Sequence, residues 1–219
     1  MSTALEVTGF FMCLIGWVLT GLAVANDYWK ISSVQGNVII SNRLYENLWH
    51  ACGEDSTGKA NCQDFQSMLA LPVHIQACRA LMIISLILGL VGIILSSMGL
   101  KCIQIGSKSN ESKGKAMVIG GIIFILSGLC AMVGVSWYAG RVVAEFNDPF
   151  FGGVKFELGS GLFIGWGGAA LCILGGAFKC SAYKRFSKTK DKGAYYPGAK
   201  PQTIYTAAPS NIDNPKAYV

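Results

Sequence analysis

Four stretches without a charged side chain constrain this chain more than any other feature. They contain 20, 21, 25 and 21 residues, and they lie between Glu6 and Asp27, Arg79 and Lys101, Lys115 and Arg141, and Glu157 and Lys179. A helix of roughly 20 apolar residues crosses the hydrocarbon core of a bilayer. We therefore expect four membrane-spanning helices, over residues 7–26, 79–100, 116–140 and 158–178.

The composition agrees with a membrane protein. Of the 219 residues, 52% are hydrophobic and only 14% are charged, whereas soluble domains carry about 25% charged residues. The chain is also too short for several large domains. We expect one compact unit over residues 1–182, followed by a disordered tail over residues 183–219 that is polar and holds several prolines.

Basic residues predict the orientation in the membrane. Twelve of the 18 lysines and arginines fall in the loop over residues 101–115 or in the segment from Lys179 onward. Cytosolic loops are rich in such residues, so both termini should be cytosolic. The segments 27–78 and 141–157 are then extracellular. Ala23-Val24-Ala25 resembles a signal-peptidase site, but the segment lacks a basic start, and we expect the first helix to be retained.

The first extracellular segment, 27–78, is long enough to form a small domain. It holds strand-like runs over residues 28–31, 37–40, 45–52 and 60–65, with turn residues between them. Residues 67–77 are more typical of a helix that leads into the second span. We expect an α-helical membrane fold, a left-handed four-helix transmembrane bundle that carries a small extracellular antiparallel β-sheet.

Two cysteines, Cys52 and Cys62, lie close together on the expected oxidising side. A metal site there would need two more ligands, and His50 and His74 have no spacing that supports one. A disulfide that closes a hairpin is the prediction, with no metal and no cofactor. Beside the membrane on the cytosolic side, Cys102 and Cys180 are candidates for S-acylation.

These residues together resemble the claudin family of four-span tight-junction proteins. The pattern is Trp29, then Asn47-Leu48-Trp49-His50-Ala51-Cys52, then Cys62, with Arg79 and the Glu157-Leu158-Gly159 segment further along. The resemblance covers essentially the whole chain and is greatest to the channel-forming group of claudins ten and fifteen. Three residues depart from the family pattern: Asn47 replaces a glycine, Gln66 a common proline and Asn147 a common aromatic residue.

The resemblance implies a protein that polymerises in junction strands and supports calcium-independent adhesion between cells. Met68 would insert against a neighbouring protomer near Phe146 and Leu158, unless it packs on its own protomer. The second loop would contact the opposite cell, unless its aromatic residues cap the bundle. The residues expected at that contact are Phe146, Asn147, Pro149 and Phe150.

Three acidic residues, Glu54, Asp55 and Asp64, lie around the predicted hairpin, and two of them match acidic positions of cation-conducting claudins. A few carboxylates along a pore suffice to select cations. Lys59 would weaken this field, and all these charges could instead be ordinary solvated surface. We expect sodium and other small cations as permeants.

The last two residues, Tyr218 and Val219, offer a free carboxylate after an apolar side chain. PDZ domains capture such ends by strand addition, so PDZ scaffold proteins are expected partners beside other claudins. No set of catalytic residues assembles, and we expect no enzymatic activity and no nucleic-acid partner. The leading hypothesis is a paracellular cation channel in epithelial tight junctions. The alternatives are a sealing claudin that does not conduct and a four-span auxiliary or adaptor subunit.

Overall fold

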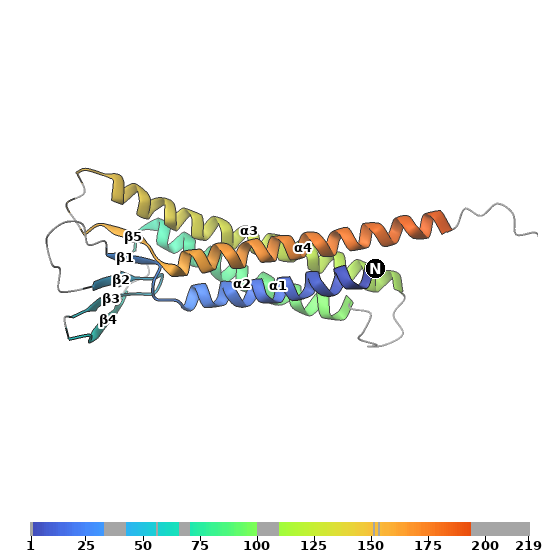
Figure 1. Ribbon diagram of the computed structural model, residues 1–219, viewed down its shortest axis with the longest axis horizontal. Coiled ribbons are helices and arrows are strands. Elements are labelled where there is room, and N and C mark those ends of the chain that lie inside the picture. Colours follow the sequence, from blue (N-terminus) through green and yellow to red (C-terminus); the bar gives the residue numbers. More distant parts are fainter. Residues whose placement is uncertain are drawn as a thin grey trace, which may run out of the picture.

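The computed structural model describes residues 2–32, 43–55, 57–65, 71–99, 110–150, 152 and 154–193. Four long helices form its stem (Figure 1). They are α1 (Ser2–Ala25), α2 (Val73–Gly99), α3 (Asn110–Asn147) and α4 (Ser160–Gly193). The N-terminal end of α1 and the C-terminal end of α4 lie at the end of the bundle away from the sheet.

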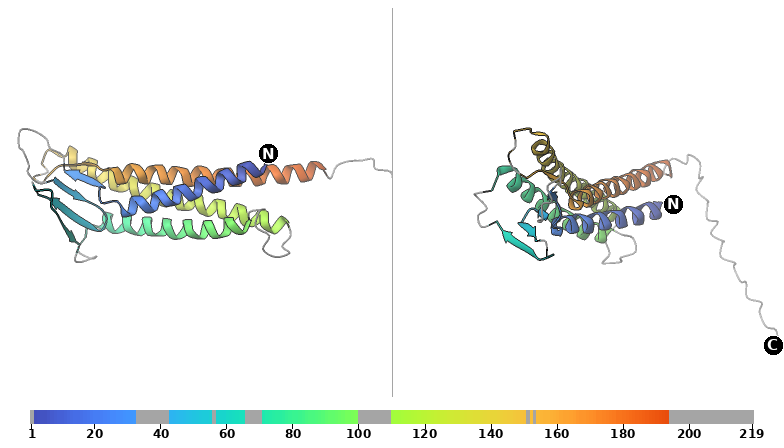
Figure 2. Two further views of the ribbon diagram at one scale, coloured as in Figure 1. Left: turned by 60° about the horizontal axis from the view of Figure 1, so that its bottom comes forward. Right: turned by 60° about the vertical axis from the view of Figure 1, so that its left-hand side comes forward.

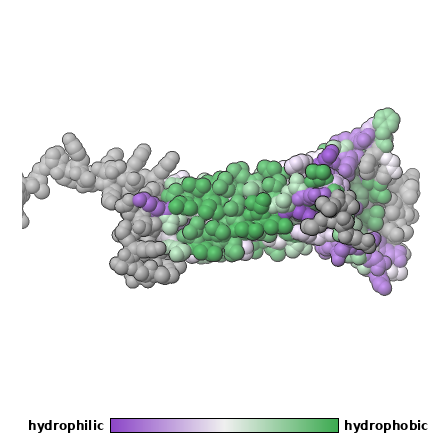
Figure 3. Space-filling model, turned by 180° about the vertical axis from the view of Figure 1, so that it is seen from behind, coloured by the Kyte–Doolittle hydropathy of each residue, from purple (hydrophilic) through white to green (hydrophobic). Residues whose placement is uncertain are grey.

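All four helices are long and apolar enough to cross a membrane. Many of their large apolar side chains are exposed on the outside of the bundle, for example Ile87, Ile94, Leu126 and Phe163. Figure 3 shows the resulting apolar band along the stem, with hydrophilic residues gathered toward the sheet end. An apolar surface of this kind requires lipid rather than water around it.

The helices pack in the order α2, α3, α4, α1, with a smaller contact between α1 and α2. Small residues permit the close approaches. A Cβ atom added at Gly168 of α4 would lie 2.9 Å from the carbonyl oxygen of Gly16 in α1. Between α2 and α3, the hydroxyls of Ser85 and Ser127 each donate to the other residue's carbonyl at 2.8 Å. Such packing is typical of helices in lipid, where no hydrophobic force drives association.

The sheet has five antiparallel strands in the order β4-β3-β2-β1-β5 (Figure 2). The strands are β1 (Lys30–Ser32), β2 (Arg43–Glu46), β3 (His50–Glu54), β4 (Ala60–Asp64) and β5 (Phe156–Leu158). The expected fold class, a four-helix membrane bundle with a small antiparallel sheet, is thereby confirmed.

Several boundaries differ from the expected ones. The run 45–52 is not one strand, because Asn47 begins a turn that divides it between β2 and β3. The segment 156–158 was not expected to be a strand. The expected strand 37–40 lies outside the described residues.

Two helices are longer than their apolar cores. Helix α3 continues to Asn147 and so includes residues that we expected in the second loop. Helix α4 continues to Gly193, so residues 183–193, expected to be disordered, are helical. The helix extends this far because the segment contains several good helix formers and has no proline before Pro197.

Candidate functional site: the sheet and its anchor on the bundle

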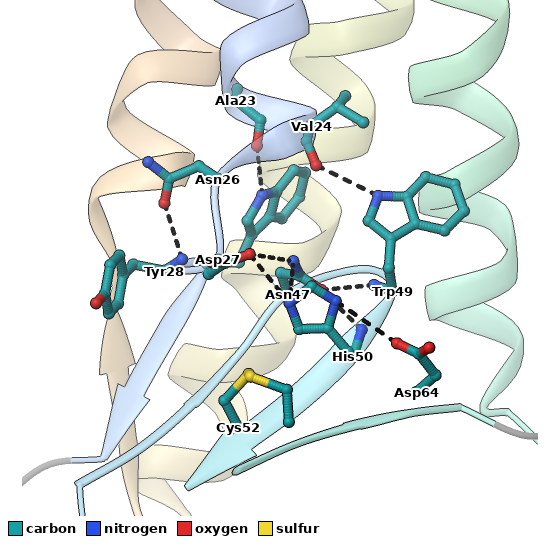
Figure 4. Close-up of polar contacts among 12 residues, drawn as sticks. Ala23, Val24, Asn26, Asp27, Tyr28, Asn47, Trp49, His50, Cys52 and Asp64 are labelled. Carbon is teal, nitrogen blue, oxygen red and sulfur yellow. Dashed lines mark hydrogen bonds and ion pairs between the residues drawn. A yellow bond between two sulfur atoms is a disulfide. The ribbon is translucent and has the colours of Figure 1, made fainter. Parts of the chain in front are cut away.

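Two indole rings fix the sheet to the end of α1 (Figure 4). Nε1 of Trp29 donates to the carbonyl of Ala23 at 2.7 Å, and Nε1 of Trp49 donates to that of Val24 at 3.3 Å. The last carbonyls of a helix lack partners within it, so the two indoles satisfy them. Trp29 is fully buried, and its ring packs edge-on against Tyr138 of α3, with centroids 5.1 Å apart.

Arg79 ties α2 to the turn between β2 and β3. Its Nε donates to the main-chain carbonyl of Leu48, whose side chain is fully buried. The guanidinium carbon lies 5.1 Å from the ring centroid of Trp49 and 5.6 Å from that of Phe65. A buried cation flanked by aromatic rings and bonded to a carbonyl is compensated for its loss of water. Four members of the expected signature, Trp29, Leu48, Trp49 and Arg79, thus form one anchor.

Asn47 shapes the turn that this anchor holds. Its Oδ1 accepts hydrogen bonds from the main-chain N–H groups of Trp49 and His50, at 2.7 and 2.8 Å. This is the Asx-type turn that asparagine forms and glycine cannot. Its Nδ2 donates to Oδ1 of Asp27 at 3.1 Å. The residue that departs from the family pattern therefore takes over the turn with its own side chain.

The predicted disulfide between Cys52 and Cys62 is confirmed. It joins directly opposed residues of β3 and β4. Tyr45 of β2 lies opposite Cys52 on the other side and packs on the ring of Tyr28, with centroids 4.8 Å apart. Burial is the main reason that the pKa of the Tyr45 hydroxyl is raised, so this tyrosine stays neutral at physiological pH and adds no charge to the sheet.

The register gathers acidic residues on one face of the sheet. Directly opposed residues of antiparallel strands point to the same side. On one side, His50 opposes Asp64, Cys52 opposes Cys62 and Glu54 opposes Ala60. Followed through the pairings of β2 and β1 to β5, the same side of the sheet also carries Glu157. We call the side that carries Glu54, Asp64 and Glu157 the acidic face. Among the residues of the five described strands, the lysine or arginine on this face is Arg43, opposite Glu54.

The opposite face of the sheet is closer to neutral. Lys30 and Glu46 are opposed there and form an ion pair, with Nζ 2.7 Å from Oε2. The ammonium group also lies 4.4 Å from the ring centroid of Phe156. The ammonium group of Lys30 therefore has its partners within the sheet, and its charge is offset there.

The three acidic residues expected to cluster are not all close together. Asp55 begins the β3–β4 turn, where its N–H donates to the carbonyl of Lys59 at 3.1 Å and its carbonyl accepts from Gly58 at 2.8 Å. Glu54 adjoins it at the end of β3, while Asp64 ends β4 at the other end of the hairpin. Four residues of strand separate the levels of Glu54 and Asp64, about 13 Å.

Phe146 and Leu158, both expected at a contact between protomers, lie together. They line an apolar cavity of about 150 Å³ between the end of α3 and β5. Val142, Val143, Phe156 and Glu157 complete its lining. Met68, the side chain expected to enter such a cavity, lies outside the described residues.

The residues expected to meet an opposite cell lie at the C-terminal end of α3 and in the turn after it. Asn147 is the last residue of the helix, and Pro149 and Phe150 lie in the turn after it. Oδ1 of Asp148 accepts from the N–H of Phe150 at 2.9 Å and so holds the turn. Phe150 is 94% exposed, which places a large apolar ring in solvent just after the end of α3.

Comparison with known proteins identifies the family. The model of the PMP-22/EMP/MP20/claudin family matches residues 3–179. Claudin-15 of Mus musculus is 47% identical over 176 residues, which cover 80% of this chain and 78% of the mouse protein. Claudin-10 of Homo sapiens is 49% identical over 188 residues, which cover 86% and 82% respectively. Claudin-19 of Rattus norvegicus is 42% identical over 181 residues, covering 82% and 81%.

The chain belongs to the PMP-22/EMP/MP20/claudin family. In this family member, the matched region contains the whole anchor, the disulfide hairpin and most of each of the four apolar helices. The expected resemblance to the claudins, and to claudins ten and fifteen in particular, is confirmed.

Some expected sites of this claudin-family chain fall outside the described residues. These are Cys102, Tyr218 and Val219. Cys180 is described and half-buried, and its thiol lies 3.9 Å from the carbonyl of Val118 on α3. A Cβ atom added at Gly121 would lie 3.1 Å from its sulfur. The thiol therefore faces a neighbouring helix.

Sequence reasoning missed the polar group at the edge of this claudin-family sheet, where the β2–β3 turn meets the end of α1. Asp27, Asn47 and His50 are bonded to one another, although 20 residues separate the first from the second. Asparagine's preference for turns was the available signal for Asn47. No pattern along the sequence places Asp27 beside it, since that contact depends on how the sheet returns to the end of α1.

Proposed function

We propose that the protein is a tight-junction strand component that forms a paracellular channel selective for cations, with sodium preferred. Membership of the claudin family and its likeness to proteins named claudin-10 and claudin-15 support the setting. The single observation that carries the selectivity is the acidic face, which bears Glu54, Asp64 and Glu157 against Arg43, whereas the charges of Lys30 and Glu46 offset each other on the opposite face.

The magnitudes suit selection by charge. A carboxylate 4 Å from a sodium ion contributes about 1 kcal/mol at the dielectric constant of water and about 4 kcal/mol at an effective value of 20. A difference of 1.4 kcal/mol is about tenfold in the affinity of such a site for an ion. Asp64 is 92% exposed, so a passing hydrated ion reaches it. Charges beyond about 8 Å are screened at physiological salt, so basic residues at the far end of the stem have no influence.

The proposed orientation places the sheet outside the cell and both termini in the cytosol. The Cys52–Cys62 disulfide supports this, because such bonds persist in oxidising compartments. Twelve of the 18 basic residues lie in the segment 101–115 or from Lys179 onward, the segments that this orientation makes cytosolic.

Strands would assemble through two surfaces. The apolar cavity beside Phe146 and Leu158 suits the flexible side chain of Met68 from a neighbouring protomer, since methionine fills irregular gaps. The exposed ring of Phe150, with Asn147 and Pro149, would contact the opposing cell.

In the cytosol, Tyr218 and Val219 would bind PDZ scaffold proteins. Cys102 and Cys180 remain candidates for S-acylation, and acylation of Cys180 requires its thiol to turn away from α3.

Expression in an epithelial monolayer that lacks cation-conducting claudins tests the proposal. Electrical resistance should fall, and dilution potentials should report a sodium permeability above that of chloride. Asp55→Asn and Asp64→Asn should each lower that preference. A rise in resistance without ion preference would instead identify a sealing claudin. Expression in cells without junction strands, followed by freeze-fracture microscopy, tests for an auxiliary subunit. A channel-forming or a sealing claudin should form strands in these cells, whereas an auxiliary subunit should form none.

A further inference from the structure

His50 lies between two carboxylates on the acidic face. It is opposed to Asp64 in the β3–β4 ladder, and its ring also reaches back to Asp27 at the end of α1 (Figure 4). Nε2 is 3.0 Å from Oδ1 of Asp27, while Nδ1 is 3.9 Å from Oδ1 of Asp64. About 25% of the side chain is exposed, so the ring is held by protein but open to solvent on one side.

The surrounding hydrogen bonds favour one tautomer of the neutral His50 ring. Oδ1 of Asn47 accepts from two main-chain N–H groups, so the other end of this side chain, Nδ2, is a donor. Nδ2 donates to Oδ1 of Asp27, and it also lies 3.3 Å from Nε2 of His50. We therefore assign the proton of the neutral ring to Nε2, since donation to the charged carboxylate of Asp27 at 3.0 Å gives a stronger bond than a contact with a neutral partner.

The other ring nitrogen then offers its lone pair toward Asp64. In the neutral imidazole, Nδ1 is an acceptor once Nε2 is the donor. It faces a carboxylate oxygen of Asp64, which is also an acceptor, across 3.9 Å. Two electron-rich atoms in this relation are stabilised by a cation between them. Zinc binds histidine nitrogen and carboxylate oxygen at about 2.0–2.2 Å, so two such ligands lie about 3.3–3.5 Å apart around a tetrahedral ion.

Closing the present gap requires only a small rotation of the Asp64 side chain, which is 92% exposed. The same exposure leaves room for water in the remaining coordination positions. Asp27 supplies what metal-binding histidines usually have, a carboxylate that accepts the N–H of the second ring nitrogen and fixes the ring. Cys52 and Cys62 are near, with ligand atoms within 4.8 Å of the ring, but their sulfurs are bonded to each other.

We propose that His50 and Asp64 form a binding site for a divalent transition-metal ion of the zinc class, with Asp27 as the positioning residue. Imidazole selects zinc, copper and nickel over sodium, magnesium and calcium. The register of β3 and β4 creates this pair, whose members are 14 positions apart in the sequence. A further consequence rests on the proposed function: the bound ion offsets the charge of Asp64 and so lowers the channel's preference for sodium.

Binding is tested on the purified full-length protein in detergent, by isothermal titration with Zn²⁺ and by X-ray absorption at the zinc edge. The wild type should show one site with a nitrogen and oxygen shell. His50→Ala should abolish it, Asp64→Asn should weaken it at least tenfold, and Asp27→Asn should weaken it 10- to 100-fold. His74→Ala, which changes the only other histidine, should leave the affinity unchanged.

Asp64→Asn guards against loss of folding, because the Asp64 side chain is exposed and its replacement opens no buried space. Zinc binding that survives both His50→Ala and Asp64→Asn, or a sulfur shell in the absorption spectrum, would overturn the inference.

The effect of zinc on conductance is measured separately. Zn²⁺ added to a monolayer that expresses the wild type should lower the ratio of sodium to chloride permeability, and His50→Ala should abolish the response. If purified protein binds zinc as described but the wild-type monolayer shows no sodium preference before zinc is added, the proposed function fails and the metal site stands. If the monolayer prefers sodium but the purified protein does not bind zinc, the metal site fails and the proposed function stands.

Discussion

The side chain of Arg79 donates from its Nε to the main-chain carbonyl of Leu48 and so joins the second membrane helix to the β2–β3 turn. Its guanidinium also lies beside the rings of Trp49 and Phe65. One residue therefore holds the sheet on the bundle by a charged hydrogen bond and by two ring contacts.

Arg79→Met should destabilise the protein strongly. The substitution keeps much of the apolar bulk but leaves the buried Leu48 carbonyl without its donor, and removes the cation from between two rings. The expected cost is about 2–4 kcal/mol, measured as a lower midpoint of thermal unfolding in one detergent. Arg43→Met, at an exposed position of β2, is the matched control and should shift the midpoint little. Equal shifts for the two variants would refute the anchoring role.

Asn47→Gly restores the residue common in the family and should nevertheless weaken this protein. Glycine permits the turn, but it cannot accept from Trp49 and His50 or donate to Asp27. We expect a loss of about 1–2 kcal/mol in stability, visible as faster hydrogen exchange at the N–H groups of Trp49 and His50. Asn61→Ala on the exposed strand β4 should leave those rates unchanged, and unchanged rates in Asn47→Gly itself would contradict the account.

Gly161→Ala should destabilise the packing of the first turn of α4 against Trp29. Its N–H donates to the carbonyl of Tyr28 at 2.8 Å, and an added Cβ would lie 2.8 Å from a ring carbon of the buried Trp29. Overpacking of this kind costs about 1–3 kcal/mol. Gly167→Ala in the same helix meets nothing within 4 Å, so it should be neutral or slightly stabilising. The unfolding midpoints of the two variants provide the comparison, and a neutral Gly161→Ala would disprove the close contact.

Glu54→Gln and Asp64→Asn should act independently on ion preference. Their levels on the hairpin are about 13 Å apart, which exceeds the screening length of about 8 Å. The double variant should therefore change the logarithm of the sodium-to-chloride permeability ratio by the sum of the single changes, within the limits found for distant sites. Dilution potentials give the three values. A double variant no worse than either single one would show that the carboxylates act as one cluster.

The sequence was sufficient for the features that depend on composition along the chain. Four uncharged stretches predicted α1 to α4, because lipid tolerates few charges in a span. The pair Cys52 and Cys62 predicted the disulfide, since only those two cysteines lie close together in the loop. The family resemblance predicted that Trp29, Trp49 and Arg79 matter, without indicating what they contact.

Other features depend on pairing between distant segments, which no local pattern records. Strand β5 has only three residues and pairs with β1, more than 120 positions earlier. The opposition of His50 and Asp64 follows from the hairpin register, and a slip of one residue would move every side chain to the other face. Asp27 joins them only because the sheet folds back onto the end of α1.

The central claim, that the acidic face borders the path of the ions, is tested most directly by reversing charge on neighbouring residues that face opposite sides. Asp64 and Gln63 are adjacent on β4 and both are exposed, but Gln63 opposes Ala51 and points away from the acidic face. Dilution potentials should show that Asp64→Lys abolishes or inverts the sodium preference, whereas Gln63→Lys changes it little. Equal effects of the two lysines, or none from Asp64→Lys in strands of normal abundance, would contradict the claim.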